Sequence, residues 1–204
     1  MSVPPPETSP DDERAALRRR LIEVATDVLA EEGPSALTAR RVTRDAGTST
    51  MAVYTHFGGM PGLVRAIVGD GFARLDRRMG EVPITDDPLQ DLVALGESYR
   101  RHALEHPHMY AVMFGTTSLG GYGLNREERE IGLVAFGNLV AGVQRAMDAG
   151  VLRQGSPDAV AGQLWTALHG YVMLEQSGFH LVVDHPEADV LAPMMTNLMV
   201  GLMA

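Results

Sequence analysis

The amino-acid sequence predicts an all-α protein of about nine helices, with a three-helix N-terminal module, a connecting helix and a larger helical C-terminal domain. Two observations support this prediction. Apolar residues recur at intervals of three and four along most of the chain, which is the spacing of an amphipathic helix, and no segment reads as a strand. Helix-capping residues and helix-ending glycines divide the chain into segments of helical length.

The first predicted helix follows a short polar tail. Residues 1–8, MSVPPPET, are rich in proline and are expected to be a disordered tail. Ser9 and Pro10 are a typical helix start, with an acidic residue at the third helical position. Leucine, valine and alanine then recur at helical spacing until Gly33, which ends the helix.

Two short helices are predicted next. Thr38 can cap the first of them, which ends at Gly47. Ser49 is expected to cap the second, which ends at Phe57 before a pair of glycines. Two helices of about two turns each, joined by a turn that contains glycine, form a helix-turn-helix unit.

A fourth helix is expected to connect this unit to the remainder of the chain. It starts near Pro61, carries apolar residues along one side, and ends near Gly80, before the acidic, proline-containing segment EVPITDDP. We place the domain boundary in that segment. The expected organisation is therefore a helix-turn-helix domain over residues 9–58, a connecting helix over 59–80 and a C-terminal domain over 81–204.

The C-terminal domain is predicted to contain five further helices and no strand. Asp87, Asn125 and Ser156 supply capping signals, and Pro107 begins a short helix of its own. The five helices are expected to cover approximately residues 88–106, 107–114, 126–149, 157–178 and 190–203.

The charge of the chain is unevenly distributed. All 17 basic residues are arginines, and the net charge is −9. Up to residue 80 there are 11 arginines and 11 acidic residues, whereas from residue 81 onward there are 6 arginines and 15 acidic residues. The N-terminal module is thus neutral, and a neutral module can still bind nucleic acid if its arginines share one face.

Composition also limits the classes of site. The chain has no cysteine, which excludes disulfides, thiolate metal sites and cysteine nucleophiles. The N-terminus lacks the apolar region of a signal peptide, and no stretch approaches the roughly 18 apolar residues of a membrane span. We therefore expect a cytoplasmic protein that does not associate with membranes.

The segment from Leu37 to Ile67, LTARRVTRDAGTSTMAVYTHFGGMPGLVRAI, is the most informative part of the chain. Gly47 permits a turn with positive φ, and Ala46 is small enough for two helices to approach each other. The apolar residues Val42, Val53 and Phe57 are expected to face inward and to fix the angle between the two helices. The remaining residues of the second helix are then expected to face outward, namely Thr50, Met51, Ala52, Tyr54, Thr55 and His56.

This segment resembles the DNA-binding domain of the tetracycline-repressor (TetR) family. The pattern comprises Leu-Thr, a basic helix, Ala-Gly, a recognition helix that ends in Tyr-x-x-Phe, and a following helix with leucine in its first turn. The matching residues are Leu37, Thr38, Arg40, Arg41, Val42, Ala46, Gly47, Ser49, Val53, Tyr54, Phe57 and Leu63. The resemblance implies a homodimeric, DNA-binding transcriptional regulator, by default a repressor that a small-molecule effector releases from a palindromic operator.

The resemblance and the residue types together assign roles at the DNA. Thr38 and Ser49 lie at helix N-termini, where hydroxyl and N–H groups suit phosphate oxygens. Thr50, Met51 and Thr55 are expected to read bases, because their methyl and hydroxyl groups suit base edges in the major groove. Further contacts to phosphates or bases are expected from Arg40, Arg41, Arg44, Tyr54 and His56.

Several of these residues have an alternative interpretation. Thr38 and Ser49 cap helices whether or not DNA is bound, and Tyr54 can serve packing alone. The arginines at 18–20 suit either a solvated helix face or phosphate contacts. Many relatives have a phosphate-binding lysine where this chain has Met60, and N–H groups of Gly58, Gly59 and the following helix are expected to substitute for it.

The C-terminal domain resembles one class of TetR-type regulators that carries a Trp-His-Gly signature, here Trp165, His169 and Gly170. Trp165 and His169 lie one helical turn apart, either in the core or at a ligand, and Gly170 would let another helix approach closely.

The resemblance implies a ligand cavity and a dimer interface. The residues expected at the ligand are Tyr99, His102, Met109, Tyr110, Met113, Phe136, Trp165 and His169. Those expected in the dimer interface, through the last two helices, are Met194, Met195, Leu198, Met199 and Leu202, which are too apolar for a solvated helix.

Two other function classes are alternatives to a ligand-responsive regulator. An enzyme is disfavoured because the seven histidines form no metal-spaced motif and no acid–base constellation. A DNA-binding protein without a ligand, or a haem sensor that uses a histidine or methionine, is the second alternative. No cofactor and no metal ion is expected.

Overall fold

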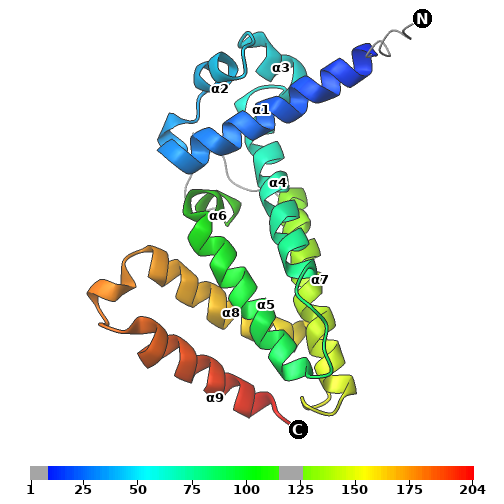
Figure 1. Cartoon of the computed structure of the whole chain (residues 1–204), viewed down its shortest axis with the longest axis vertical. Coiled ribbons are helices and arrows are strands. Elements are labelled where there is room, and N and C mark those ends of the chain that lie inside the picture. Colours follow the sequence, from blue (N-terminus) through cyan, green and yellow to red (C-terminus); the bar gives the residue numbers. More distant parts are fainter. Residues whose placement is uncertain (1–8, 115–125) are drawn as a thin grey trace, which may run out of the picture. The chain divides into compact units, whose positions relative to one another are not determined.

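The structure, a computed structural model, describes residues 9–114 and 126–204, and the side chains of α7 from residue 132 onward. Over these residues it is all-α, as predicted, and its strand-type pairing is limited to one isolated bridge between Leu152 and Met203. The helices are α1 (Pro10–Glu32), α2 (Ala39–Asp45), α3 (Met51–Phe57), α4 (Met60–Gly80), α5 (Pro88–Glu105), α6 (Pro107–Met113), α7 (Arg126–Asp148), α8 (Pro157–Gln176) and α9 (Ala192–Leu202), as Figure 1 shows.

Most predicted helix starts are confirmed by their capping bonds. The Ser9 hydroxyl accepts a hydrogen bond from the Asp12 backbone N–H at 3.2 Å, and the Asp12 carboxylate accepts from the Ser9 N–H, which completes a capping box. Thr38 and Ser156 cap α2 and α8 through bonds to the third helical N–H. Asp87 caps α5 by accepting from two backbone N–H groups.

Two predicted boundaries need correction, and one lies outside the described residues. Ser49 does not cap α3: the helix begins at Met51, the flanking Thr50 already has helical backbone angles, and no side chain accepts from the first turn. The α8 helix ends at Gln176 rather than at Gly178. The predicted cap of α7, Asn125, is not among the described residues.

The described residues form two compact units. One comprises residues 9–71 and 108–114, and the other comprises residues 72–107 and 126–204. The division falls inside α4. The core of the first unit is built from the inward faces of α1 to α4, whose fully buried side chains are Leu21, Ala25, Leu29, Val42, Val53, Leu63, Ile67 and Val68.

The second unit is a bundle in which α5, α7 and α8 pack against one another, while α9 packs against α8. Its buried apolar residues include Val143, Ala146, Leu152, Ala161 and Val172. The segment before α5 is fixed to this core by Asp91, which is 3% exposed. Its carboxylate accepts from the backbone N–H and the hydroxyl of Thr85 and from Arg145. No helix among the described residues is long and apolar enough to cross a membrane.

Candidate functional site

The turn between α2 and α3 is set by Gly47. This residue has a φ of +68°, in the left-handed region that favours glycine. The N–H of Gly47 donates to the Arg44 carbonyl at 3.2 Å, and the N–H of Thr48 donates to the Thr43 carbonyl at 2.9 Å. These two bonds form a Schellman motif, which satisfies the last carbonyls of α2 and ends the helix. The predicted positive-φ turn is confirmed.

The end of α3 is held against the start of α4 by a second glycine, which the sequence analysis did not single out. A Cβ atom placed on Gly62 would lie 1.8 Å from the Phe57 carbonyl oxygen. Any larger residue at position 62 would therefore have to displace the last turn of α3. A glycine within a helical pattern does indicate a close backbone approach, so the signal was present in the sequence.

An exposed surface on α3 carries the residues predicted to read bases. Met51 is 65% exposed and Tyr54 is 60% exposed, and Thr55 is also exposed. Residues at i, i+3 and i+4 lie on one side of a helix, so these three side chains form one stripe. Large side chains left in solvent on one stripe are typical of a binding surface. Thr50 and Ser49 are exposed in the turn before it, and His56 is half-buried.

Two arginines of α2 are exposed beside the turn. Arg40 is exposed in the first helical turn, and the side chain of Arg44 is 66% exposed. The Arg44 Nε–H donates to Asp45 at 3.0 Å, which leaves its other N–H donors available for a phosphate. That bond, followed by attraction to Arg41, lowers the pKa of Asp45. Thr38, at the start of the same helix, is exposed as well.

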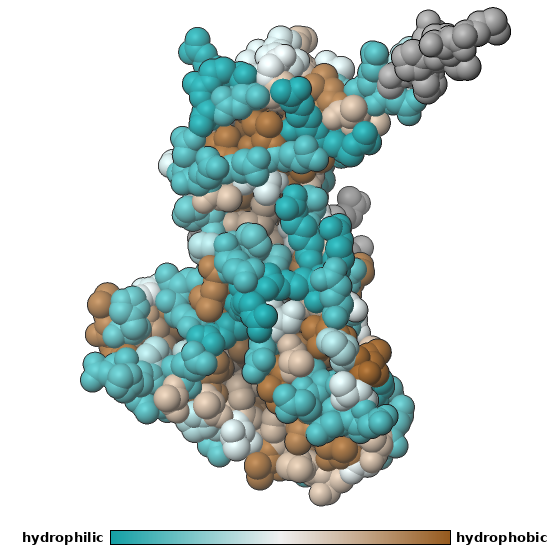
Figure 2. All heavy atoms as spheres, viewed as in Figure 1, coloured by the Kyte–Doolittle hydropathy of each residue, from teal (hydrophilic) through white to brown (hydrophobic). Residues whose placement is uncertain are grey.

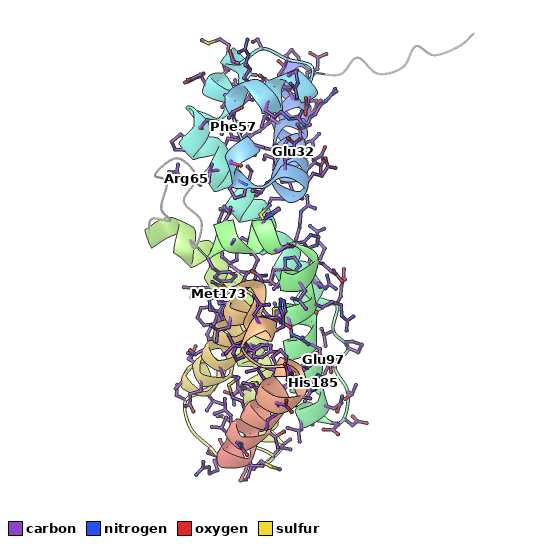
Figure 3. The ribbon with its side chains drawn as sticks, turned by 90° about the vertical axis from the view of Figure 1, so that its left-hand side faces the viewer. Glu32, Phe57, Arg65, Glu97, Met173 and His185 are labelled. Carbon is purple, nitrogen blue, oxygen red and sulfur yellow. The ribbon has the colours of Figure 1, made fainter. Side chains whose placement is uncertain are left out.

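Arg41 differs from these two arginines. Its guanidinium pairs with Glu32 at the end of α1, labelled in Figure 3, and with Asp45 one turn further along α2. The hydrogen bond to Glu32 is the main cause of a raised pKa for Arg41. In the single chain Arg41 therefore joins α2 to α1, because two carboxylates already bind its guanidinium.

Arg18 has a specific contact that the sequence left open. Its guanidinium carbon lies 5.2 Å from the centre of the Phe57 ring, at the end of α3 (Figure 3). An arginine over an aromatic face at this distance gains a cation–π attraction. Arg18 thus joins the middle of α1 to the helix that carries the exposed stripe.

Two further expectations about this surface are wrong. Ala52 was expected to face outward, but it is 8% exposed and lies in the core beside Val53. The N–H groups of Gly58 and Gly59 were expected to be free for a phosphate. They donate instead to the carbonyls of Tyr54 and Val53, because they terminate α3.

Four of the residues predicted to contact a ligand meet in the second unit. We call Tyr99, Phe136, Trp165 and His169 the aromatic cluster. The Trp165 Nε1–H donates to the Tyr99 hydroxyl at 3.1 Å, and that hydroxyl lies 3.0 Å from His169 Nδ1. Trp165 and His169 stack with ring centres 5.1 Å apart, and Phe136 meets Trp165 edge-on at 6.0 Å. Helices α5, α7 and α8 all contribute to the cluster.

The other predicted ligand residues are distributed differently. His102 lies in the same unit as the aromatic cluster and is 3% exposed. Met109, Tyr110 and Met113, all buried, belong to α6 and to the first unit, where the two methionine sulfurs pack on Gly71 of α4. Gly170 was expected to admit a close helix, but a Cβ there would meet no described atom within 4 Å.

The predicted dimer residues all lie on α9. Met194, Met195, Leu198, Met199 and Leu202 are half-buried, and no residue of α9 is fully buried. The end of the helix is fixed to the segment before α8, because the Arg153 N–H donates to Leu202 and the Ala204 N–H donates to Val151. Figure 2 shows apolar residues at the surface among polar ones over α8 and α9.

Two protein-family models match the chain. Residues 21–67 match the model described as bacterial regulatory proteins, tetR family. Residues 92–198, just over half of the chain, match the model described as tetracyclin repressor-like, C-terminal domain. The chain belongs to the TetR family. It is accordingly a DNA-binding transcriptional regulator, and α2 and α3 are its helix-turn-helix.

Individual relatives agree with this assignment. An uncharacterised HTH-type transcriptional regulator of Mycobacterium tuberculosis, Rv0681, is 30% identical over 189 residues, which are 91% of this chain and 81% of the relative. A protein of unknown function from Rhodococcus sp. RHA1 has a solved structure with 26% identity and a TM-score of 0.76, over 92% of this chain and 96% of that one.

A third relative shares the fold alone. The structure of RolR in complex with the ligand resorcinol is 18% identical to this chain, with a TM-score of 0.64 over 81% of this chain and 82% of that one.

Proposed function

We propose that this TetR-family regulator is a homodimeric repressor that binds a palindromic operator and is released from it by a small-molecule effector. The observation that supports the operator part is the stripe of Met51, Tyr54 and Thr55 on α3, which stays in solvent beside the exposed Arg40 and Arg44. In this proposal the α3 residues read bases, while Thr38, Ser49 and the arginines bind phosphates and fix the register.

The dimer part rests on α8 and α9. A helix with the sequence APMMTNLMVGL, none of whose residues is fully buried in the single chain, is too apolar to remain in solvent. Leu174 of α8 and Val200 of α9 are 53% and 63% exposed. A second copy of the chain would cover these residues, and the dimer would carry two α3 helices, as a palindrome with half-sites about 34 Å apart requires.

The release step follows from the effector's preference for one arrangement of the two subunits. An effector that binds more tightly to an arrangement in which the α3 helices no longer match the groove spacing would shift the population toward it. The aromatic cluster is the proposed contact point, because it lies among α5, α7 and α8, which pack together. The structure of RolR in complex with resorcinol is a precedent for a small aromatic ligand on this fold.

Selection of bound DNA from a random library tests the proposal. We expect a palindrome whose half-sites are one helical turn apart, and expression from a promoter that carries it should fall when the protein is present. An Arg40→Ala or Tyr54→Ala change should weaken binding by roughly tenfold or more, because each removes a contact to DNA, while the melting temperature stays close to wild type.

Glu97→Ala on α5, an exposed position in the second unit, is the control and should leave DNA binding unchanged. Failure to enrich any motif at modest salt would overturn the proposal. Equal loss of folding in the Arg40→Ala and Tyr54→Ala variants would show that the two residues serve the fold rather than contact DNA.

A further inference from the structure

The aromatic cluster has a fixed polar arrangement. An indole N–H only donates, so the Tyr99 oxygen must accept from Trp165 at 3.1 Å. The same hydroxyl lies 3.0 Å from Nδ1 of His169 and so orients that ring. Tyr99 is buried, whereas Phe136, Trp165 and His169 are half-buried. The three half-buried rings therefore keep part of their surface available to another molecule.

His102 supplies an unsatisfied hydrogen-bonding atom one turn along α5 from Tyr99. Residues at i and i+3 share one helix face, and both side chains are buried. Nε2 of His102 is inaccessible to solvent and has no hydrogen-bond partner among the described residues. A buried polar atom without a partner costs free energy, so a ligand that offers it a hydrogen bond gains affinity at this position.

The aromatic cluster contains no ionised side chain, and of the charged groups that act on His102, Arg78 is already paired with Glu105. Burial, then the positive charges of His106, Arg78 and Arg74 against the single acid Glu105, lower the pKa of His102 to about 4. Burial also lowers the pKa of His169. Both imidazoles are consequently neutral at pH 7.

Three arginines of this unit, among the side chains that the structure describes, are already bound to carboxylates. Arg100 of α5 binds Glu175 through two nitrogens and also binds Glu187, and Arg78 binds Glu105 through two nitrogens. Asp91 is held by Arg145 and Thr85. A charged ligand packed against the rings of the aromatic cluster would therefore lose its hydration without meeting an ionised partner among those rings.

We propose that the effector is an uncharged aromatic compound with a hydroxyl group, whose ring packs against Trp165 and its neighbours in the aromatic cluster while its hydroxyl bonds to Nε2 of His102. The aromatic cluster favours a planar ring, since aromatic pairs gain from stacked and edge-on contacts. A hydroxyl both donates and accepts, so it can satisfy either tautomer of the neutral His102. This inference rests on the proposed function in so far as it requires an effector.

Trp165 is the single tryptophan of the chain, so its fluorescence reports on the cluster without any label. Three probes of matched shape and different charge are benzyl alcohol, benzoate and benzylammonium, each titrated at pH 7 into the full-length protein without DNA. Benzyl alcohol should change the Trp165 emission in a saturable way and bind at least about tenfold more tightly than either charged probe. A charged probe that binds as tightly, or no saturable change with any of the three, would overturn the inference.

Variants of α5 test the hydrogen bond. The affinity for benzyl alcohol relative to toluene should fall roughly tenfold in His102→Phe, because only benzyl alcohol uses Nε2. Glu97→Ala, at an exposed position on the same helix, should keep the wild-type ratio. An unchanged ratio in a folded His102→Phe overturns the assignment of the hydroxyl, and the charge series on the wild-type protein decides the effector class even if that variant does not fold.

These titrations contain no DNA. A failure to bind the neutral probe therefore rejects this inference alone, whereas a failure of DNA selection rejects the proposed function.

Discussion

At the scale of single residues, His102 makes the stability of the protein depend on pH. Burial, with the nearby positive charges of His106 and Arg78, lowers the pKa of His102 from 6.5 to about 4. Between these values the unfolded chain binds a proton that the folded chain excludes. This contribution to stability is therefore complete above pH 6.5, and it falls as the pH is lowered through the window to about 4. The lowered pKa of His169 acts with the same sign.

The expected result is a melting temperature that decreases between pH 7 and pH 4, with a shallower decrease in the His102→Phe variant. The variant loses one of the groups that titrate in this window and keeps His169, so the slope should be reduced rather than abolished. Thermal unfolding followed by circular dichroism in a series of buffers gives both slopes. Identical slopes for the two proteins would show that His102 takes up its proton equally well in the folded state.

Residue identity alone did not determine which arginines of α2 remain available for DNA. Arg40, Arg41 and Arg44 look alike in the sequence. The structure distinguishes them, because Arg41 forms an ion pair with Glu32. Glu32 lies on another helix, so the residue spacing within α2 could not predict this contact. The exposed stripe of Met51 and Tyr54 could be predicted, since it depends only on helical periodicity and on an apolar opposite face.

At the scale of helices, the turn at Gly47 and the starts of α1, α2, α5 and α8 were predictable, whereas the start of α3 was not. Gly47 was anticipated because only glycine readily adopts its positive φ. The predicted cap of α3 by Ser49 was wrong, because Thr50 already has helical backbone angles and no side chain accepts a hydrogen bond from the first turn. The ligand set was predicted as one group, yet α6 and the aromatic cluster belong to different compact units.

The junction of α3 and α4 yields the element-scale prediction. Gly62→Ala should destabilise the protein by roughly 1–3 kcal/mol, because the new Cβ collides with the backbone of Phe57, which cannot move without shifting α3. Operator binding should fall further than stability alone explains, since α3 carries the exposed stripe. Gly162→Ala in α8, where a Cβ meets nothing within 4 Å, is the matched control and should be neutral or slightly stabilising. Equal stability of the two variants in urea unfolding would mean that α4 moves away from Phe57 without cost.

At the scale of the whole molecule, the exposed stripe of α3 and the apolar helix α9 lie in different compact units, and binding to a palindromic operator would require two copies of the chain. The neutral N-terminal part carries the exposed stripe of α3, while the acidic C-terminal part carries the aromatic cluster and the apolar helix α9. Acidic residues away from the DNA disfavour non-specific association with the phosphate backbone. A single α3 helix makes too few base contacts for a specific site, so affinity for a palindrome depends on two copies acting together.

Val200→Glu tests that dependence. Val200 is 63% exposed in the single chain, so the change should leave the fold of each subunit almost unaffected. In the proposed dimer the new carboxylate would be buried without a partner, at a cost of about 3–5 kcal/mol, which raises the dimer dissociation constant by roughly two to nearly four orders of magnitude. Sedimentation should then show monomers at concentrations where the wild type is dimeric, and operator binding should be lost in parallel. Val93→Glu, at an exposed apolar position on α5, is the control and should remain dimeric. A dimeric Val200→Glu protein that still binds the operator would place the subunit interface elsewhere than on α9.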